Sequence, residues 1–470
     1  MRTKINLAFL LMQGIALCSV AQTSYDVSPL MEQELSGTAR YLGMGGAMGA
    51  FGSDLSVIGR NPAGIGTYKT DESSISLSFS GSHTDMFNPG NVYASDGTFI
   101  SYSAKRTNSD IRFFADNVSF VVNLPTSGSL FSDVNLAFAY RRAKDVDRSI
   151  VYMDDCIMPW GGTEYRDYAN NQRIRTNAFD FNISFNTDDQ FYWGLTFETL
   201  HSYLYNSGHY YHYIPVPAGV SEEPVDINSV DFANDMSAIG WNLKLGVIAR
   251  PNAGNFRFGV SFATPTLYNV DQIYEDKLYA VDGEKRDGKR FEQSQYYRFS
   301  SPWVINASLG YSTAHTAFGL EYDCNIANRS YLRINGTKLT EQGGYTDFQP
   351  FSVIRAGVET NVSKFSFRLG YNYNVQMFDK DAHKYLGDTS FNNKRMDITY
   401  ENQKDAHTAT FGVGYCSSPG FFGGQFYADA AFVYNWRNSE LHLAEYPDID
   451  PVTDYLTGTG KFVLTFGVTF

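Results

Sequence analysis

The carboxyl-terminal ten residues alternate between apolar side chains and small or polar ones. One face of this segment carries Phe462, Leu464, Phe466, Val468 and Phe470, and the other carries Lys461, Val463, Thr465, Gly467 and Thr469. A period of two residues predicts a β-strand with one apolar face. Such a terminal strand suits a membrane barrel, whose outer face meets lipid and whose inner face meets a lumen. The last strand of a soluble sandwich is the alternative for this segment alone.

Similar alternation recurs along the chain from residue 73 onward. We identify fourteen such segments, at 73–80, 115–124, 133–143, 177–186, 191–205, 239–250, 256–266, 298–311, 314–324, 353–360, 365–373, 407–416, 424–434 and 461–470. The pattern predicts an all-β fold, a transmembrane antiparallel β-barrel of about 14 strands, because outer-membrane barrels have an even number of strands. Inward charged residues such as Arg141, Asp180 and Arg368 would be costly in a sandwich core but tolerated in a wet lumen.

The connections between these segments alternate in length without exception. The short ones lie near 125–132, 187–190, 251–255, 312–313, 361–364 and 417–423, and the long ones near 81–114, 144–176, 206–238, 267–297, 325–352, 374–406 and 435–460. Outer-membrane barrels have short periplasmic turns and long extracellular loops, whereas a soluble sandwich has no reason to place every long loop at one end. The alternation therefore favours a barrel with both termini in the periplasm.

The amino terminus has the pattern of a secretory signal peptide. Arg2 and Lys4 precede a largely apolar run over residues 5–20, and Ser19-Val20-Ala21 supplies a small-x-small cleavage site. We expect residues 1–21 to be removed and the protein to reach the bacterial outer membrane. There its surroundings would be lipid and lipopolysaccharide. Phe466, Val468 and Phe470 end the chain like an outer-membrane insertion signal, so the barrel-assembly machinery would be a further partner.

Composition excludes several classes of function. After residue 21 no apolar run is long enough to cross a bilayer as a helix, yet the chain carries 33 Tyr and 36 Phe, a load that amphipathic strands explain. The net charge of −13 argues against nucleic-acid binding, which needs a basic surface. No Cys or His spacing is typical of a metal site, and no cofactor is predicted. A single disulfide between Cys156 and Cys324 is left open.

Residues 22–72 do not alternate and are rich in glycine. A piece of this size is too small to build its own core, but it can fill a wide barrel. We therefore divide the chain into a signal peptide (1–21), a plug (22–72) and a barrel (73–470). The glycines at 43–46 superficially suggest a phosphate loop, but the GxGxxG spacing, a Walker lysine and a preceding strand are all missing.

The motifs of the plug resemble the amino-terminal hatch of the FadL/TodX family of outer-membrane transporters for long-chain fatty acids and other hydrophobic compounds. The matching positions, in order, are Gly37, Arg40, Met44, Gly45, Gly46, Asp54, Asn61, Pro62, Ala63 and Gly64. The resemblance implies a monomeric fourteen-stranded barrel plugged by a hatch. It also implies passive uptake of a hydrophobic small molecule, which binds in the lumen and leaves through the wall once the hatch shifts.

That scheme also implies an apolar collecting surface on the extracellular loops. The third long connection contains an unusually apolar stretch, and exposed apolar patches tend to be binding sites. The candidate ligand-binding residues are Tyr210, Tyr211, Tyr213, Ile214 and Val216, with Trp160 in the second long connection. Packing of these loops against one another is the alternative reading.

Four other functions remain as alternatives. A porin for polar solutes has the same barrel, although a plug would obstruct bulk flow. His209 and His212 flank two tyrosines and suggest haem capture. An enzyme is not expected, because the adjacent pairs His201/Ser202 and His407/Thr408 place their side chains on opposite faces of a strand. A structural or adhesive role has only the length of the loops in its favour.

Overall fold

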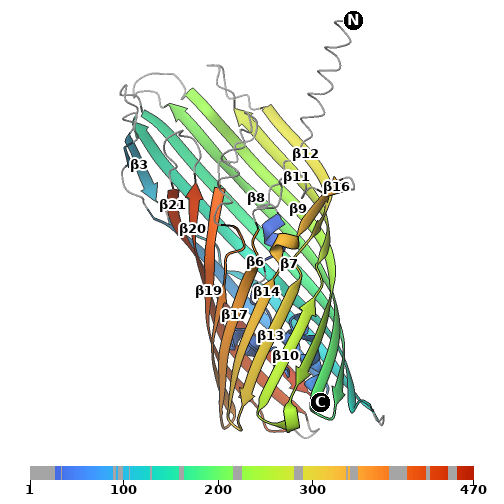
Figure 1. Cartoon of the computed structure of the whole chain (residues 1–470). Coiled ribbons are helices and arrows are strands. Elements are labelled where there is room, and N and C mark those ends of the chain that lie inside the picture. The colour runs from blue at the N-terminus through green and yellow to red at the C-terminus, as the bar shows by residue number, and fades with distance from the viewer. Residues whose placement is uncertain are drawn as a thin grey trace, which may run out of the picture.

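The computed structural model describes residues 27–32, 34–87, 92–93, 99–104, 106–126, 130–157, 163–214, 225–279, 289–334, 337–338, 348–379, 400–419, 424–442 and 452–470. Most of them belong to one antiparallel sheet, which closes into a barrel where β1 pairs with β21 (Figure 1). No helix among the described residues is long and apolar enough to cross a membrane. The signal peptide expected at 1–21 lies outside the described residues.

Fourteen strand positions form the wall, as the alternation predicts. In chain order they are β1 (Glu72–Met86), β5 (Arg112–Pro125), β6 (Asp133–Ile157), β7 (Thr163–Thr187), β8 (Phe191–Ile214), β9 (Val225–Ala249), β10 (Phe256–Ala263) with β11 (Leu267–Tyr279), β13 (Val304–Ser312) with β12 (Lys289–Ser300), β14 (Thr316–Asn325) with β15 (Tyr331–Ile334), β17 (Phe351–Val362), β18 (Phe365–Asn374), β19 (Tyr400–Cys416), β20 (Gln425–His442) and β21 (Val452–Thr469). Smaller elements lie in the connections: β2 (Val92–Tyr93), β3 (Phe99–Ala104), β4 (Arg106–Asn108), β16 (Thr337–Lys338), η4 (Pro251–Ala253) and η5 (Ala327–Arg329).

Several of the expected long loops are in fact continuations of the strands. β6, β7 and β9 have 25 residues each and β8 has 24, whereas a tilted strand crosses a bilayer with about 9–11 residues. The connections expected over 144–176 and 206–238 are therefore mostly tall hairpins. Their polar composition is compatible with strands that stand in water beyond the bilayer, and for that reason the period-two signal of a lipid-facing strand is lost there.

The alternation places apolar side chains on the outside of the wall, as expected. In β21, Phe462 and Phe466 are each 40% exposed, whereas Val463 and Thr465 point inward and are fully buried. Phe470, after the strand, is 69% exposed, and its backbone N–H donates to the carbonyl of Asp71. A continuous outward apolar face is what lipid requires of a spanning barrel.

The described residues of 27–68 lie inside the barrel, the first of them near its middle height and the rest toward its lower end (Figure 1). They form four short helices: η1 (Ser28–Leu30), α3 (Ala39–Gly43), η2 (Leu55–Gly59) and η3 (Pro62–Thr67). Most of their residues are buried against inward-facing residues of the wall. We call residues 27–68 the hatch, and its first six residues, 27–32, the strip.

Three adjacent wall strands are interrupted at the same height. β10 breaks from β11 at residues 264–266, β12 from β13 at 301–303, and β14 from β15 at 326–330. Pro265 and Pro302 lie in two of these breaks, and proline has no N–H to donate to a ladder. The outward-facing residues change from even to odd numbers across each break, so each break shifts the alternation between the two faces. We call this region the wall break.

Candidate functional site: the hatch and the lumen above it

Short helices in the hatch begin at the residues of the family-like motif. Asn61 is fully buried, and its side chain accepts a hydrogen bond from the backbone of Ala63 at 3.2 Å, which caps η3. Its amide group also donates to the carbonyl of Gly49 at 2.8 Å. Pro62 occupies the first helical position, where its missing N–H costs nothing. The carbonyl of Gly64 accepts from the Ser53 backbone, so the motif both starts the helix and ties the hatch together.

Asp54 connects two more helix ends. Its carboxylate accepts from the Ser56 backbone at 2.8 Å, which caps η2, and from the Thr38 hydroxyl at 2.7 and 2.9 Å. The Thr38 hydroxyl in turn accepts from Tyr41 and caps α3. Burial raises the pKa of the Asp54 carboxyl, although the nearby Arg40 opposes this shift. Gly37, which precedes Thr38, has φ +139° and donates its N–H to Asp116 of β5 at 3.1 Å.

Glycines let the hatch backbone lie against the wall. Gly45 has φ +60°, and a Cβ placed on it would lie 2.8 Å from the backbone nitrogen of Tyr371. Gly46 has φ +78° and donates to the carbonyl of Tyr41. The neighbouring Met44 is 1% exposed and packs in the hatch core. Glycine is therefore needed at these positions for a tight turn and for close approach to the wall.

Arg40 fastens the hatch to the wall through charge. Its guanidinium makes two bonds to the carboxylate of Glu359, at 2.9 and 3.0 Å. Glu359 also accepts from Arg368 at 2.6 Å, and Arg368 reaches Asp429 at 2.5 Å. Arg368, expected to face a wet lumen, is 4% exposed and fully paired. At this height the lumen is filled by the hatch, so inward charges are satisfied by one another.

A second charge cluster contains Arg60 of the hatch. Arg60 contacts Asp323 at 2.8 Å, and Arg355 of β17 contacts the same carboxylate at 2.7 Å. Glu321 accepts from Arg355 at 3.1 Å and from the Gly49 backbone at 2.9 Å. Such buried groups are costly unless each has its partners. The cluster therefore holds the hatch against the neighbouring strands β14 and β17.

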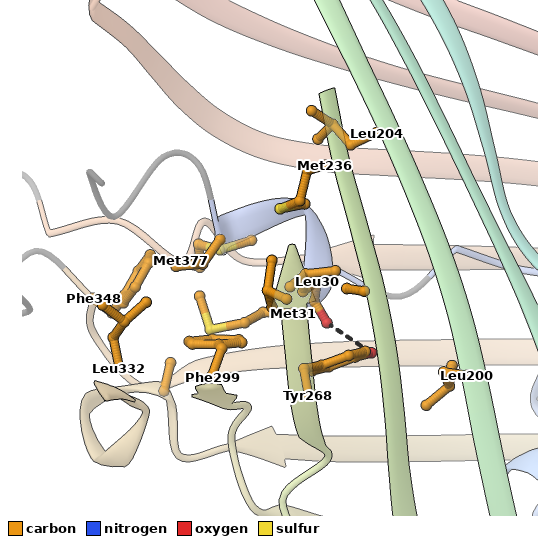
Figure 2. Packing of buried hydrophobic residues seen from close by; sticks show 14 of the residues in the cluster. Leu30, Met31, Leu200, Leu204, Met236, Tyr268, Phe299, Leu332, Phe348 and Met377 are labelled. Atoms are coloured by element: carbon orange, nitrogen blue, oxygen red, sulfur yellow. Dashed lines mark hydrogen bonds between the residues drawn. The ribbon is translucent and has the colours of Figure 1, made fainter. Parts of the chain in front are cut away.

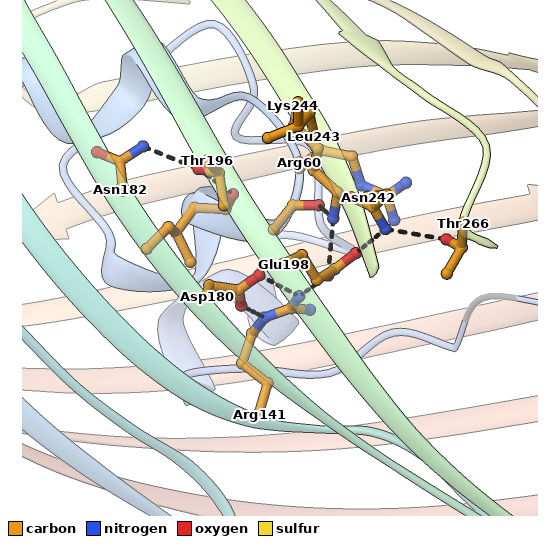
Figure 3. A network of polar contacts seen from close by, with 12 residues as sticks. Arg60, Arg141, Asp180, Asn182, Thr196, Glu198, Asn242, Leu243, Lys244 and Thr266 are labelled. Atoms are coloured by element: carbon orange, nitrogen blue, oxygen red, sulfur yellow. Dashed lines mark hydrogen bonds and ion pairs between the residues drawn. The ribbon is translucent and has the colours of Figure 1, made fainter. Parts of the chain in front are cut away.

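A third charge cluster joins β6, β7, β8 and β9 (Figure 3). Glu198 accepts from Arg141 at 2.7 Å, from Lys244 at 2.8 Å and from Asn242 at 2.6 Å. Arg141 also pairs with Asp180 at 2.6 Å. Lys244 donates to the carbonyl of Gly59 in the hatch at 2.8 Å. The three clusters together close the lower lumen with buried, paired charges.

Above the clusters, the strip inserts into an apolar surface of the lumen (Figure 2). Val27, Leu30 and Met31 of the strip are 0%, 8% and 4% exposed. They belong to one cluster with inward residues of the wall, which include Leu204, Met236, Val270, Tyr297, Phe299, Leu332, Phe351 and Val353. Inward positions of a spanning barrel are usually polar. An apolar lining at this height is therefore the feature of the lumen that most needs an explanation.

Ion pairs hold the strip at its carboxyl end. Glu32 contacts Arg437 of β20 at 2.6 Å and Lys144 of β6 at 2.9 Å. Lys144 also donates to the carbonyl of Pro29 at 3.2 Å. Burial alone would raise the pKa of the Glu32 carboxyl, but the charges of Arg437 and Lys144 hold that pKa below its ordinary range. The strip is thus attached to two separate strands of the wall, β6 and β20.

Two cavities adjoin the strip, and Pro29, Glu32 and Glu34 line both of them. The upper cavity, of about 220 Å³, lies toward the tall hairpins and is lined by side chains such as Asn206, Met377 and Arg437. The lower cavity, of about 90 Å³, is bounded below by the third charge cluster. The strip is therefore the partition between them.

The lower cavity reaches the wall break. Its lining includes Thr264 and Thr266 from one side of the break and Ser301 and Pro302 from the other. Side chains replace part of the ladder here: the Leu243 backbone donates to the Thr264 hydroxyl at 3.0 Å, and the Thr266 backbone to the Ser301 hydroxyl at 2.8 Å. Backbone bonds remain beside them, from Thr264 to the Leu243 carbonyl at 2.9 Å and from Ser301 to the Thr266 carbonyl at 3.0 Å, so side-chain and backbone hydrogen bonds together close the wall at this point.

A second interruption separates β5 from β6. Their ladder covers Asn117–Pro125, but the described pairings of residues 112–115 are with β1 only. Arg112 bridges the gap with ion pairs of 2.9 Å to both Asp145 and Asp147. This part of the wall is closed by charge.

The apolar stretch expected in a loop belongs to a strand. Tyr210, Tyr211, Tyr213 and Ile214 extend β8 and pair with β7 and β9, so the prediction that they lie in a loop is wrong. Tyr211 donates its hydroxyl to Asp231 at 2.6 Å. Val216 and Trp160 lie outside the described residues. The interpretation missed the continuation because β8 carries polar residues between Leu204 and Tyr210.

The other candidate residues are engaged in local contacts. His209 stacks on Tyr211 with ring centroids 4.3 Å apart. His407 is bonded to the Tyr371 hydroxyl at 2.7 Å, on the outer face. Cys324 is a free thiol, so it does not pair with Cys156. Within the described part of the chain, no group of three or more His, Cys, Asp or Glu residues is arranged to hold a metal ion.

Comparison with known proteins gives matches among solved structures alone: no family model and no curated protein matches the sequence. A Pseudomonas aeruginosa FadL homologue superposes with a TM-score of 0.62 at 12% identity, over 94% of this chain and 99% of that one. A deltaS2 mutant of the TodX monoaromatic hydrocarbon channel gives 0.56 at 11%, over 92% and 98%. The Pseudomonas putida toluene transporter TodX gives 0.51 at 11%, over 93% and 99%.

These similarities extend over nearly the whole length of both chains. They match the fold that the alternation and the hatch motifs predict. The sequence identity to each of the three structures is only 11–12%. Of these three proteins, one is described as a monoaromatic hydrocarbon channel and one as a toluene transporter. This chain therefore has the fold of the FadL and TodX outer-membrane channels.

Proposed function

We propose that this protein is an outer-membrane channel for the passive uptake of hydrophobic small molecules, and that the strip gates it. The observation that carries the proposal is the apolar surface inside the lumen, which Val27, Leu30 and Met31 cover. Water would wet this surface if the strip left. A hydrophobic ligand can replace the strip there, because each CH₂ group taken out of water contributes about 0.8 kcal/mol.

The two cavities suggest the route. A ligand enters the upper cavity between the tall hairpins and displaces the strip. It then reaches the lower cavity, which the third charge cluster closes toward the periplasm. Moving an apolar molecule past buried Arg141, Glu198 and Lys244 would break paired charges at high cost. The wall break beside Thr264 and Pro302 offers an exit into lipid that avoids this cost.

The orientation follows from the same scheme. The carboxyl terminus lies at the end of the barrel that carries the short turns (Figure 1). We assign this end to the periplasm and the tall hairpins to the outside of the cell. The outward Phe466 and Phe470 would then serve the barrel-assembly machinery during insertion. The protein acts as a monomer in this scheme, in contact with lipid and lipopolysaccharide.

A porin for polar solutes is the second candidate function. The upper cavity has many polar side chains, which favours it. The hatch argues against it, since its backbone approaches the wall closely at Gly45 and its charges are paired with β14 and β17. A solute path would require the whole hatch to leave, whereas the hydrophobic route requires only the strip to move.

Binding of a fluorescent sixteen-carbon fatty acid to the purified, refolded protein tests the proposal. Phe299→Ala, in the apolar cluster, should weaken saturable binding, and Phe256→Ala, on the outer face and 53% exposed, should leave it unchanged. Competition with haem would reveal a haem receptor. Absence of binding, together with sugar or ion permeation through reconstituted bilayers, would favour the porin.

The exit route has its own test in transfer of the bound fatty acid to lipid vesicles. Pro302→Trp should slow transfer without weakening binding, because it fills the lower cavity at the wall break. The matched variant Arg112→Trp alters the other interruption. Slower transfer in Arg112→Trp alone would place the exit between β5 and β6.

A further inference from the structure

We propose that the preferred ligand is an amphiphile with an apolar tail and an uncharged head group bearing hydroxyls, in preference to a bare hydrocarbon or an anionic fatty acid. This inference rests on the proposed function and names the class of substrate for the same lumen. It follows from carboxamide side chains around the upper cavity, part of which form a layer directly above the apolar cluster.

The layer is built by strand register. Ile174, Leu204 and Met236 are neighbours across β7, β8 and β9 in the apolar cluster. Two residues farther toward the hairpin ends, the same faces carry Gln172, Asn206 and Asn234, which are again neighbours. Two residues along a strand span about 7 Å. An apolar layer and a carboxamide layer are therefore stacked one above the other in a single cavity.

Four carboxamides around the upper cavity, Asn206 among them, have a buried side-chain oxygen without a donor from the described protein atoms. On one side of the upper cavity, the side-chain oxygens of Asn170 and Asn206 are buried without a protein donor. Across the cavity the same is true of Asn372 and Asn374, which lie beside the apolar cluster, since Asn374 pairs with Val353. Asn372 is only 4% exposed. Buried polar groups are normally satisfied, and an unsatisfied group costs free energy. Four carboxamide oxygens without a protein donor around one cavity point to a place for a ligand's hydrogen-bond donors.

The chemistry of the carboxamide selects the head group. A carboxamide both donates and accepts, and a hydroxyl does the same, so each can satisfy the other in either orientation of the amide. An alkane offers neither donor nor acceptor and would leave the carboxamides unsatisfied. A carboxylate only accepts and would need a cation to offset its loss of hydration.

The cations of the upper cavity are already occupied. Arg437 is paired with Glu32 at 2.6 Å, and Lys404 with Glu440 at 2.6 Å. The Arg148 side chain also has an interaction partner. The Glu34 side chain adds a carboxylate to the lining of the cavity. This arrangement disfavours an anionic head and leaves neutral hydrogen-bonding groups as the better match.

The test compares three radiolabelled probes with the same sixteen-carbon tail, namely 1-monopalmitoylglycerol, palmitate and hexadecane, binding to the full-length refolded protein at neutral pH. We expect the glycerol ester to bind about tenfold more tightly than either other probe. Asn206→Leu and Asn372→Leu should each remove most of this preference while leaving hexadecane binding unchanged or tighter. Asn255→Leu, in a short turn far from the cavity, is the matched control.

The outcomes separate the inference from the proposed function. Equal binding of all three probes, or tightest binding of palmitate or hexadecane, would overturn the head-group inference and leave hydrophobic uptake standing. A preference for the glycerol ester that both asparagine variants retain would also overturn it. Failure of every probe to bind would overturn the proposed function and this inference together.

Discussion

Weakening the apolar contacts of the strip should release it from the lumen wall. The perturbation is the double substitution Leu30→Ala and Met31→Ala, at side chains that are 8% and 4% exposed in the cluster with Tyr268 and Phe299. Neither residue takes part in the ion pairs of Glu32. The change therefore removes apolar packing and leaves the electrostatic attachment in place.

The magnitude follows from the burial. Replacing a buried Leu or Met by Ala costs about 2–5 kcal/mol, and the lower end applies here because the strip is short and can settle into the space. Two such changes amount to about 4 kcal/mol, or roughly a thousandfold in the ratio of released to docked strip. The fraction of molecules in which the strip is released should rise by that factor.

Hydrogen exchange measures this ratio directly. The Met31 amide donates to the carbonyl of Ser28 at 3.0 Å, and the Leu42 amide in α3 to that of Thr38 at 2.9 Å. Exchange of strip amides should accelerate roughly a thousandfold in the double variant, as the docking free energy requires. Exchange at Leu42 should stay unchanged, which makes it an internal reference within the hatch.

A matched control is available on the outer face. Leu309 and Leu320 are paired across β13 and β14 and are 40% and 51% exposed. Their double replacement by Ala should leave strip exchange as in the wild type. Unchanged strip exchange in the Leu30/Met31 variant would refute the reasoning, since it would mean that apolar contact does not hold the strip.

Three further predictions concern the attachment of the hatch. Glu32→Gln should accelerate hydrogen exchange of the strip, because it leaves Lys144 without its ion pair. In the wild type, the ion pairs lower the pKa of the Glu32 carboxyl in the folded state. The strip should therefore stay docked above pH 4.5, the ordinary pKa of this group, and loosen only below it. Gly45→Ala should expose the hatch to protease in detergent, because it combines φ +60° with a clash at the Tyr371 nitrogen. Asn61→Ala should lower the stability of the hatch by at least about 1 kcal/mol, the usual value of a lost cap, measured as the protease concentration needed to cleave it.

The sequence predicted the wall well because lipid imposes a simple rule. The alternation in β21 and the turns of the short connections are local signals, and the structure places Phe462 and Val463 on the faces that they indicate. The hatch motif was also local: Asn61 and Asp54 cap short helices within their own segment. These features depend on neighbours in the sequence, so they can be read from it.

The apolar lining of the lumen could not be read in the same way. Tyr296 faces outward and Tyr297 inward, but after the break Trp303 and Ile305 face outward. A single period of two carried through this region assigns Tyr297 to the wrong face. The partners of the buried charges were equally hidden, since Arg40 meets Glu359 across 319 positions of sequence. Such pairings depend on the closure of the barrel and on the position of the hatch.

The central claim is that the strip and a hydrophobic ligand compete for one apolar surface in the lumen. Photolabelling of the full-length protein with a sixteen-carbon chain that carries a terminal diazirine tests it most directly. We predict saturable labelling of inward residues such as Val270 and Phe299, with stronger labelling in the Leu30/Met31 variant, where the surface is open. Labelling confined to outward residues such as Phe258, and unchanged by the variant, would contradict the account.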